Sequence, residues 1–454
     1  MKEYIFSQVP VDVPHLQTKH RKICTPIPSP STIETIKNCW KYEPYSMNNQ
    51  LPIVWDKAID YQIFDNAGNC WIDFTSTIFV ANVGHAHPLV CDAILKNTSK
   101  GLLNAYYYPT DLRAELTKLL IEITPEKLNK VLLLTTGSES TEAAIKMMKI
   151  FGLKNHNKSM IIGLENSFHG KTMGAQMAGG KIKDKFWIGY QHPEMIHIPY
   201  PYPWVLEEKQ ISGSEFFNMS MRQLAKKGFD LSKVAGFITE PYQGWCAAFL
   251  PCDYVQEMRK WCDRNYALLA IDEVQSGFGR TGKLFAFEHF GIEPDIICCA
   301  KGISSSLPLS AVITGEEIIG DEGSFNSTHG GNPLAVAASI ASINVLLNDQ
   351  LVDESDRKGK LLHSHLLDWQ SERPDYITRI YTRGLLSGIF VNNPLTPGDN
   401  ILFVDKIIER AMQKGLISIR TSSGTLKIGP PLTIPDEALI EGVQVLKESL
   451  EECL

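Results

Sequence analysis

Short apolar runs recur through the middle of the chain, and they constrain its fold more than any other feature of the sequence. Most of them are closed by glycine, threonine or an acidic residue, and helical patterns such as 140–151 and 254–265 lie between several of them. Strands that are apolar without alternation, and that are separated by helices, are typical of a mainly parallel sheet covered on both faces. Ligands of such sheets bind where the strands end. The runs are 131–136, 160–164, 195–198, 235–239, 268–274, 296–300 and 311–314.

The length and the two ends of the chain indicate a second domain. A chain of 454 residues is too long for one ordinary core. An apparent hairpin lies at 61–73, and the last stretch closes in an amphipathic helix that begins at Thr433 or Asp436. Near 331–333 the sequence changes into a long helical pattern over 334–347. We therefore expect a large domain over 96–344 and a smaller α+β domain built from 1–95 and 345–454.

Composition and charge disfavour several classes of function. The net charge is −7, from 44 basic and 51 acidic residues, and no lysine- or arginine-rich block is present, so nucleic-acid binding has little support. No apolar stretch reaches membrane-spanning length, and the N-terminal sequence lacks the apolar core of a signal peptide. The ten cysteines show neither zinc-site nor redox-motif spacing, which fits free thiols in a reducing compartment. We expect a cytoplasmic enzyme with neither a membrane nor a nucleic-acid partner.

The most informative stretch reads LLAIDEVQSGFGRTG at 268–282 and is followed by IICCAKG at 296–302. It places Asp272 at the end of one apolar run and Lys301 at the end of the next. An acid and a lysine there are costly to desolvate unless they serve a ligand or each other, and a structural salt bridge is the simpler alternative. The glycines at 277–282 also satisfy the dinucleotide fingerprint, but an aromatic segment follows them in place of a helix start. A nicotinamide site is therefore disfavoured.

The whole pattern resembles the cofactor signature of the class III, or omega, aminotransferases, which are pyridoxal-phosphate (PLP) enzymes of fold type I. The resemblance implies that Lys301 forms the Schiff base with PLP and then carries the proton as base and acid. It implies that Asp272 keeps the ring nitrogen protonated, that Gln275 bonds the phenolic oxygen and that Val274 packs on the ring. The implied fold is α/β, with a mainly parallel seven-stranded sheet in the large domain and a smaller α+β domain from both chain ends.

Four further motifs occur in the order of the family, and the third of them, T-E-P at 239–241, matches the family's E-P. G-S-E-S at 137–140 starts a helix and suits a phosphate, although an ordinary N-cap is the alternative. S-F-H-G at 167–170 has phenylalanine where the family usually has tyrosine, so the stacking face is kept and the hydroxyl is lost. Thr328 matches a threonine that, in relatives, reaches the cofactor phosphate of the neighbouring subunit. This match implies a homodimer with shared active sites. The cofactor contacts implied by these motifs are Gly137, Ser138, Phe168, His169, Glu240 and Thr328, with Glu142 in support.

The substrate residues follow from departures from the family pattern. Relatives that use 2-oxoglutarate commonly have a carboxylate-gripping arginine three residues before the C-terminal Pro-Pro pair. This chain has Lys427 there, which keeps the charge but not the bidentate geometry. Some amine-accepting relatives have a mobile arginine ten residues before the prolines, where this chain has Arg420. In S-T-I-F-V at 76–80, Phe79 replaces a glycine and narrows the pocket. We expect all three residues to contact substrate, with Arg420 favoured over Lys427 for the carboxylate.

The implied reaction is transfer of an amino group from an amine or ω-amino acid to a keto acid (2-oxoglutarate or pyruvate) or an aldehyde, by a ping-pong mechanism. Relatives with the same cofactor residues include racemases and aminomutases, so a PLP-dependent isomerase is the alternative reaction, and a PLP-binding protein without turnover is a further one. The histidines of G-H-A-H-P at 84–88 match a loop of the family, and no carboxylate or cysteine completes a metal site there. No metal is expected.

Overall fold

The computed structural model describes residues 4–48, 50–320, 325–395, 398 and 400–454. The chain divides into two compact units. The large unit is Pro88–Val352, and the small unit combines Met1–His87 with Asp353–Leu454. These boundaries differ from the predicted ones at 95/96 and 344/345. They differ at the first boundary because α3 (Pro88–Thr98) packs against α11 (Pro333–Asn348) and so belongs to the large unit.

The large unit is built on a seven-stranded sheet with the strand order β6-β14-β13-β12-β9-β7-β8. Each apolar run predicted as a strand forms one of its members. Strand β14 is antiparallel to both of its neighbours, and the other neighbouring pairs are parallel. The sheet is thus mainly parallel, which confirms the prediction from the unalternating runs. The strands are β6 (Lys130–Leu134), β7 (Met160–Leu164), β8 (Met195–Ile198), β9 (Val234–Thr239), β12 (Leu268–Asp272), β13 (Ile296–Cys299) and β14 (Ser310–Thr314).

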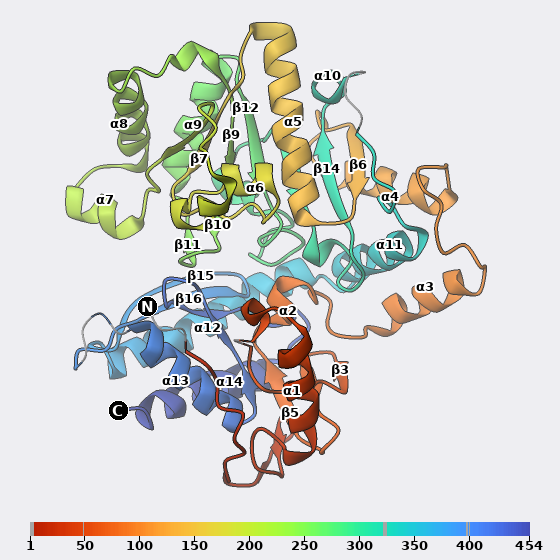
Figure 1. The fold of residues 1–454 in the computed structure, drawn as a ribbon, viewed down its shortest axis with the longest axis vertical. Helices are drawn as coiled ribbons and strands as arrows, with labels where there is room; N and C mark the ends of the chain where they lie inside the picture. The colour runs from red at the N-terminus through yellow and green to blue at the C-terminus, as the bar shows by residue number, and fades with distance from the viewer. Residues whose placement is uncertain (1–3, 49, 321–324, 396–397, 399) are drawn as a thin grey trace. The chain divides into compact units, whose positions relative to one another are not determined.

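Helices bury the apolar side chains of this sheet. α5 (Gly137–His156) packs against β9, β13 and β14, while α8 (Gly213–Lys226) and α9 (Cys252–Arg264) pack together beside β8 and β12 (Figure 1). α5 starts at a capping box in which Thr136 and Glu139 each bond the other's backbone N–H. Further elements of the unit are α4 (Asp111–Glu122), α6 (Met173–Ala178), α7 (Pro203–Lys209), α10 (Glu316–Ile319) and the hairpin of β10 (Tyr242–Gln243) and β11 (Ala248–Phe249).

The small unit is α+β and contains both ends of the chain. β17 (Leu416–Ile417) pairs with β5 (Cys70–Asp73), which joins C-terminal to N-terminal sequence in one sheet. That sheet continues through β4 (Gln62–Phe64) and β3 (Lys57–Ile59) on one side and β2 (Lys22–Ile23) and β1 (Leu16–Gln17) on the other. A second, antiparallel sheet has the order β15 (Ile377–Arg383), β16 (Leu386–Val391), β19 (Leu426–Ile428) and β18 (Ile419–Arg420). The longer helices are α1 (Ile33–Tyr42), α12 (Leu351–Glu372), α13 (Asn400–Gln413) and α14 (Asp436–Glu451).

None of the helices in the described part of the chain is by itself long and apolar enough to cross a membrane. One bent pair, α11 with α12, passes the same test jointly, by length and composition only.

A left-handed turn follows β5 in the small unit. It is formed by α2 (Ser76–Phe79), whose residues have φ angles of 47°, 51°, 61° and 68°. Residues other than glycine rarely adopt this region, and the β-branched Thr77 and Ile78 are especially disfavoured there. Left-handed helical geometry costs roughly 1–2 kcal/mol per residue. Strain of this kind persists only where the surrounding contacts hold it in place.

Candidate active site

Lys301 and Asp272 follow neighbouring parallel strands of the large unit. β12 ends at Asp272, which pairs with Cys298, and Lys301 follows shortly after β13. Because the carboxyl ends of parallel strands meet at one edge of a sheet, the two side chains lie in the same region. Burial lowers the pKa of the Lys301 amine to about 8, against the opposing charges of Asp272 and Glu240. An amine with this pKa is partly neutral near neutral pH, as a nucleophile must be.

Asp272 is held in a fixed orientation by two donors. Nδ1 of His169 donates to its Oδ2 at 2.8 Å, and the backbone N–H of Val274 donates to its Oδ1 at 3.1 Å. Both side chains of the acid–histidine pair are buried. Burial lowers the pKa of His169, but the hydrogen bond and charge of Asp272 outweigh it, so the pKa is raised overall. His169 was predicted as a cofactor contact, and the structure places its ring directly on the carboxylate of Asp272.

Glu240 connects two of the loops that carry predicted cofactor residues. It follows β9, which lies beside β12, and its carboxylate is buried. Its Oε2 accepts from the backbone N–H of Phe168 at 2.9 Å, and its Oε1 accepts from the N–H of Gly244 at 3.1 Å, with Nε2 of Gln275 at 3.5 Å. Burial raises the pKa of Glu240 to about 7, with His169 opposing and Asp272 adding to the shift. Glu240 therefore positions the loops and does not point freely into solvent.

The N-terminus of α5 is packed so closely that glycine is required beside it. A Cβ on Gly137 would lie 3.0 Å from Cγ1 of Val274, and a Cβ on Gly170 would lie 2.3 Å from Oγ of Ser138. The N–H groups of a first helical turn have no acceptor within the helix. The capping box satisfies the N–H groups of Thr136 and Glu139. The backbone at Gly137 and Ser138 therefore offers donors and a positive helix end to an anion such as a phosphate.

Two residues further along α5 hold the loop after β7. Oγ1 of Thr141 donates to the backbone oxygen of His169 at 2.7 Å. Oε1 of Glu142 accepts from Oγ1 of Thr172 at 2.6 Å and from the two backbone N–H groups at the start of α6 at 2.8 and 3.1 Å. Thr141 was not predicted from the sequence. Its place one helical turn after Gly137, on the same face of α5, is the signal that could have identified it.

Thr328 lies at the surface of the large unit, in the turn before α11. The preceding residue, Ser327, donates from Oγ to Oε1 of Glu139 at 3.3 Å, which places this turn beside the first turn of α5. The role expected of Thr328 needs a second subunit and stays a prediction.

Phe79 and Lys427 lie together in the small unit. Nζ of Lys427 is 4.9 Å from the ring centre of Phe79, and the two residues are 5% and 1% exposed. Oγ of Ser76 donates to the backbone oxygen of Gly429 at 2.7 Å. A Cβ on Gly429 would lie 2.0 Å from Cε1 of Phe79, so the ring occupies the space that a side chain would need. The left-handed turn thus contacts Gly429, which directly follows strand β19 and lies two residues from Lys427.

Arg420 is engaged in an ion pair on the opposite face of the same hairpin. Its Nε and Nη2 donate to the two carboxylate oxygens of Asp405 on α13, at 2.6 and 2.9 Å. In the β18–β19 pairing, Ile419 lies opposite Lys427 and Arg420 opposite Leu426. Since opposed residues share a face and successive residues alternate, Arg420 and Lys427 point to different faces. The arginine expected to be mobile is therefore fixed by a buried acid.

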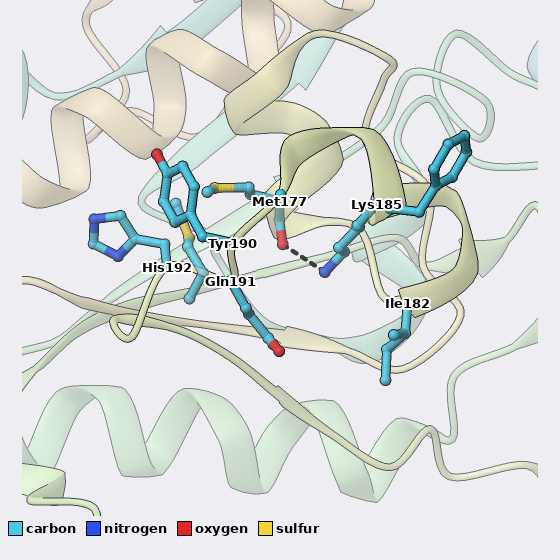
Figure 2. Close-up of a pocket in the computed structure, with 9 residues that line it drawn as sticks. Met177, Ile182, Lys185, Tyr190, Gln191 and His192 are labelled. Carbon is cyan, nitrogen blue, oxygen red and sulfur yellow. Dashed lines mark hydrogen bonds between the residues drawn. The ribbon is translucent and has the colours of Figure 1, made fainter.

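A separate pocket of about 280 Å³ lies in the large unit around the segment after α6 (Figure 2). Its lining includes Met177, Lys185, Tyr190 and His192. The Lys185 amine donates to the backbone oxygen of Met177 at 2.9 Å, and burial lowers its pKa to about 8. No residue predicted to bind the cofactor lines this pocket, so it is distinct from the site around Lys301.

Comparison with known proteins identifies the family of the chain. The family model for class-III aminotransferases matches residues 45–450. The chain is 33% identical over 420 residues to the acetylornithine aminotransferase of Methanopyrus kandleri, covering 90% of this chain and 97% of that protein. It is 30% identical over 423 residues to the acetylornithine aminotransferase of Synechocystis, covering 90% of this chain and 92% of that protein.

Solved structures show the same fold. An (S)-enantioselective omega-transaminase from Thermomicrobium roseum superposes with a TM-score of 0.83 at 26% identity, covering 93% of this chain and 98% of that one. A transaminase from the marine bacterium Virgibacillus superposes with a TM-score of 0.84 at 24% identity, covering 92% of this chain and 99% of that one.

The fold and the comparisons together define a PLP-dependent transaminase. The chain belongs to the class III aminotransferase family. The residues described above fit its cofactor, pyridoxal 5′-phosphate, because they supply a desolvated lysine amine, a buried oriented acid and a closely packed helix N-terminus. One atom among them, Nε2 of His169, is buried without a hydrogen-bond partner in the described part of the chain.

Proposed function

We propose that this enzyme moves an amino group from an ω-amino acid or a related amine to a keto acid or aldehyde, in two half-reactions of a ping-pong cycle. The observation that carries the proposal is that the desolvated Lys301 amine and the buried Asp272, whose carboxylate accepts two hydrogen bonds, lie at or just after the ends of neighbouring parallel strands. The curated relatives support an ω-amine donor, because acetylornithine aminotransferases are named for a donor of that kind.

Each residue of the large-unit site has a proposed task. PLP, when bound, supplies an electron sink for the carbon that loses its proton. Nζ of Lys301 takes that proton from the amine-bearing carbon of the donor and returns it at C4′ of the cofactor. The Asp272 carboxylate, kept in place by His169, would bind the ring nitrogen, and further residues would hold the rest of the cofactor. The proposed contacts are Gly137 and Ser138 to the phosphate, Phe168 and Val274 to the ring faces, Gln275 to the phenolic oxygen, and Glu240 to the loops.

For the acceptor carboxylate we propose Lys427 in place of Arg420. Arg420 already binds both oxygens of Asp405, and withdrawing it leaves a buried carboxylate unpaired. Lys427 lies on the other face of the hairpin, beside Phe79. This reverses the order expected from sequence spacing alone.

We further propose a homodimer in which Thr328 reaches the phosphate of the partner's cofactor, and a cytoplasmic enzyme. The exposed turn at Thr328 supports the first, and ten free cysteines, five of them buried, support a reducing compartment.

The test of the function is a spectroscopic screen of the PLP-loaded enzyme against a panel of amines without acceptor. A transaminase keeps the amino group on its cofactor, so the visible absorbance of the bound aldehyde form is lost until a keto acid is added. We expect this with ω-amino acids such as acetylornithine. A spectrum that returns to its starting form without acceptor indicates a racemase or aminomutase, and no response to any amine contradicts turnover.

A further inference from the structure

We propose that the left-handed turn Ser76–Phe79 sets the acceptor specificity of the enzyme, because the Phe79 ring holds the ammonium of Lys427 in one position. The proposal rests on the proposed function, since it takes Lys427 as the group that binds the acceptor carboxylate. The acceptor substrates are keto acids, and their carboxylate binds the single positive charge of the Lys427 ammonium. Phe79 is then a positioning residue that acts through Lys427.

The contacts of the turn, and one of Phe74 before it, converge on Gly429, which directly follows the strand that carries Lys427. Ser76 donates from Oγ to the backbone oxygen of Gly429 at 2.7 Å, and the N–H of Gly429 donates to the backbone oxygen of Phe74 at 2.8 Å. The Phe79 ring fills the space above Gly429. Residues in strained backbone conformations are kept where surrounding contacts over-determine them, and they cluster at ligand clamps. Here, all of these contacts end two residues from Lys427.

The ring gives the lysine a defined place. Lys427 is 5% exposed, and its Nζ lies 4.9 Å from the centre of the Phe79 ring. A cation near the face of an aromatic ring is attracted by the ring quadrupole, and more strongly when it is desolvated. A lysine stem is flexible, so a charge that is already ordered loses less entropy when it binds a carboxylate.

A fixed ammonium selects differently from an arginine. It lacks the planar fork that recognises both oxygens of a carboxylate in one plane. It therefore attracts a carboxylate without imposing the orientation of its plane. Keto acids with one or two carboxylates gain from this charge, whereas an uncharged aldehyde does not.

The test is a double-mutant cycle on the PLP-loaded enzyme with Phe79→Leu, Lys427→Met and the two changes together. Leucine removes the ring face, and methionine removes the charge but keeps the stem. We expect Phe79→Leu to raise the KM for pyruvate and 2-oxoglutarate about 3- to 10-fold, with an unchanged rate of the donor half-reaction. In the Lys427→Met background, Phe79→Leu should raise the KM for these keto acids further by less than about 2-fold. Equal increases in both backgrounds, or an equal increase in the KM of an uncharged aldehyde, overturn the proposal.

Ile59→Ala is the matched control, because Ile59 is an exposed isoleucine of β3 in the same unit, 49% exposed and outside the turn. The KM of this variant for keto acids should stay within about 2-fold of the wild-type value.

A second variant, Gly429→Ala, displaces the ring without changing either partner, since its Cβ would lie 2.0 Å from Cε1 of Phe79. It should raise the keto-acid KM as Phe79→Leu does, and an unchanged KM contradicts the proposal. If thermal melting shows that Phe79→Leu is unfolded, Phe79→Met, which adapts to irregular space, replaces it in the cycle.

The donor half-reaction separates failure of this inference from failure of the proposed function. If wild-type enzyme shows no donor half-reaction with any amine, the proposed function is wrong, and the inference fails with it. If the donor half-reaction is intact and the effects at Phe79 and Lys427 are additive, only the positioning role of Phe79 is wrong.

Discussion

Nδ1 of His169 lies 2.8 Å from Oδ2 of Asp272, and neither side chain is more than 4% exposed. The contact reaches across the sheet, because His169 follows β7, Asp272 ends β12, and β9 lies between them. The backbone oxygen of His169 is in turn bonded by Thr141 of α5 at 2.7 Å. The orientation of the acid therefore depends on a series of contacts that leads back to the helix proposed to bind the phosphate.

Asp272→Asn should lower turnover by a factor on the order of 10²–10³, with a much smaller loss of PLP affinity. The amide keeps the shape of the side chain but removes the charge, which matters most where negative charge builds up on the cofactor in the transition state. Steady-state kinetics and a PLP titration measure the two effects. His169→Ala leaves the charge in place and should cost less than Asp272→Asn. Near-normal turnover of Asp272→Asn contradicts the role of the acid.

PLP capture by the apoenzyme should accelerate as the pH rises, with the midpoint of the profile at about pH 8. Burial lowers the pKa of Lys301 to about 8, and only the neutral amine attacks the aldehyde. The direction follows because a lowered pKa favours the neutral form at a lower pH than in an ordinary lysine. Stopped-flow absorbance gives the profile, and borohydride reduction followed by peptide mapping identifies the residue. A midpoint near the ordinary value of 10.5, or no modified peptide containing Lys301, shows that the assignment is wrong.

Activity should be restored when inactive Lys301→Ala and Thr328→Ala protomers are mixed and allowed to form heterodimers. If Thr328 reaches the partner's cofactor, one site of the heterodimer carries both changes and the other carries neither. Native mass spectrometry establishes that heterodimers are present. Their formation without any recovered activity contradicts the shared site, and a strictly monomeric enzyme contradicts the dimer.

The fold and the centre of the site could be predicted from the sequence because both depend on local pattern. Short apolar runs without alternation, separated by helical patterns, indicate buried strands. Asp272, inside the run 268–274, and Glu240 and Lys301, each just after a run, lie at or directly after strand ends whatever the details of packing. The apolar runs overestimated the ends of some strands, because the run at 268–274 continues into the polar motif that follows β12 and ends at Val274, two residues beyond the strand.

Side-chain partners could not be predicted in the same way, because they depend on contacts between distant segments. His169 lies 103 residues from Asp272 in sequence, and no periodicity connects them. The spacing of Arg420 from the prolines gave no sign that β18 turns it away from Lys427. The left-handed turn was also unforeseen, since Thr77 and Ile78 argue locally against it. Its conformation follows from Phe79 and Gly429, which meet only in the folded unit.

Arg420→Ala should destabilise the enzyme by about 2–4 kcal/mol at neutral pH and leave the keto-acid KM nearly unchanged. Arg420 donates two bonds to the carboxylate of Asp405, which is 3% exposed, so its removal leaves a buried charge without its ionic partner. Chemical denaturation and steady-state kinetics measure the two quantities on the same preparation. An increase of about 10-fold or more in the keto-acid KM, with unchanged stability, restores Arg420 as the carboxylate-binding residue.

The pH dependence of the stability of Arg420→Ala provides a second, independent test of this prediction. Burial raises the pKa of Asp405 above its ordinary value even though the paired Arg420 lowers it, so removal of the arginine must raise that pKa further. When a carboxyl group has a higher pKa in the folded state than in the unfolded state, its ionised form lowers the stability of the folded protein. This loss of stability disappears as the pH falls, because the folded protein takes up the proton. The stability deficit of Arg420→Ala should therefore be largest near pH 7 and shrink toward pH 4. Asp405→Asn combined with Arg420→Ala removes the buried charge, so its stability difference from wild type should vary much less over the same range. A deficit in Arg420→Ala that is constant with pH means that the lost stability comes from the packing of the arginine stem and not from its charge.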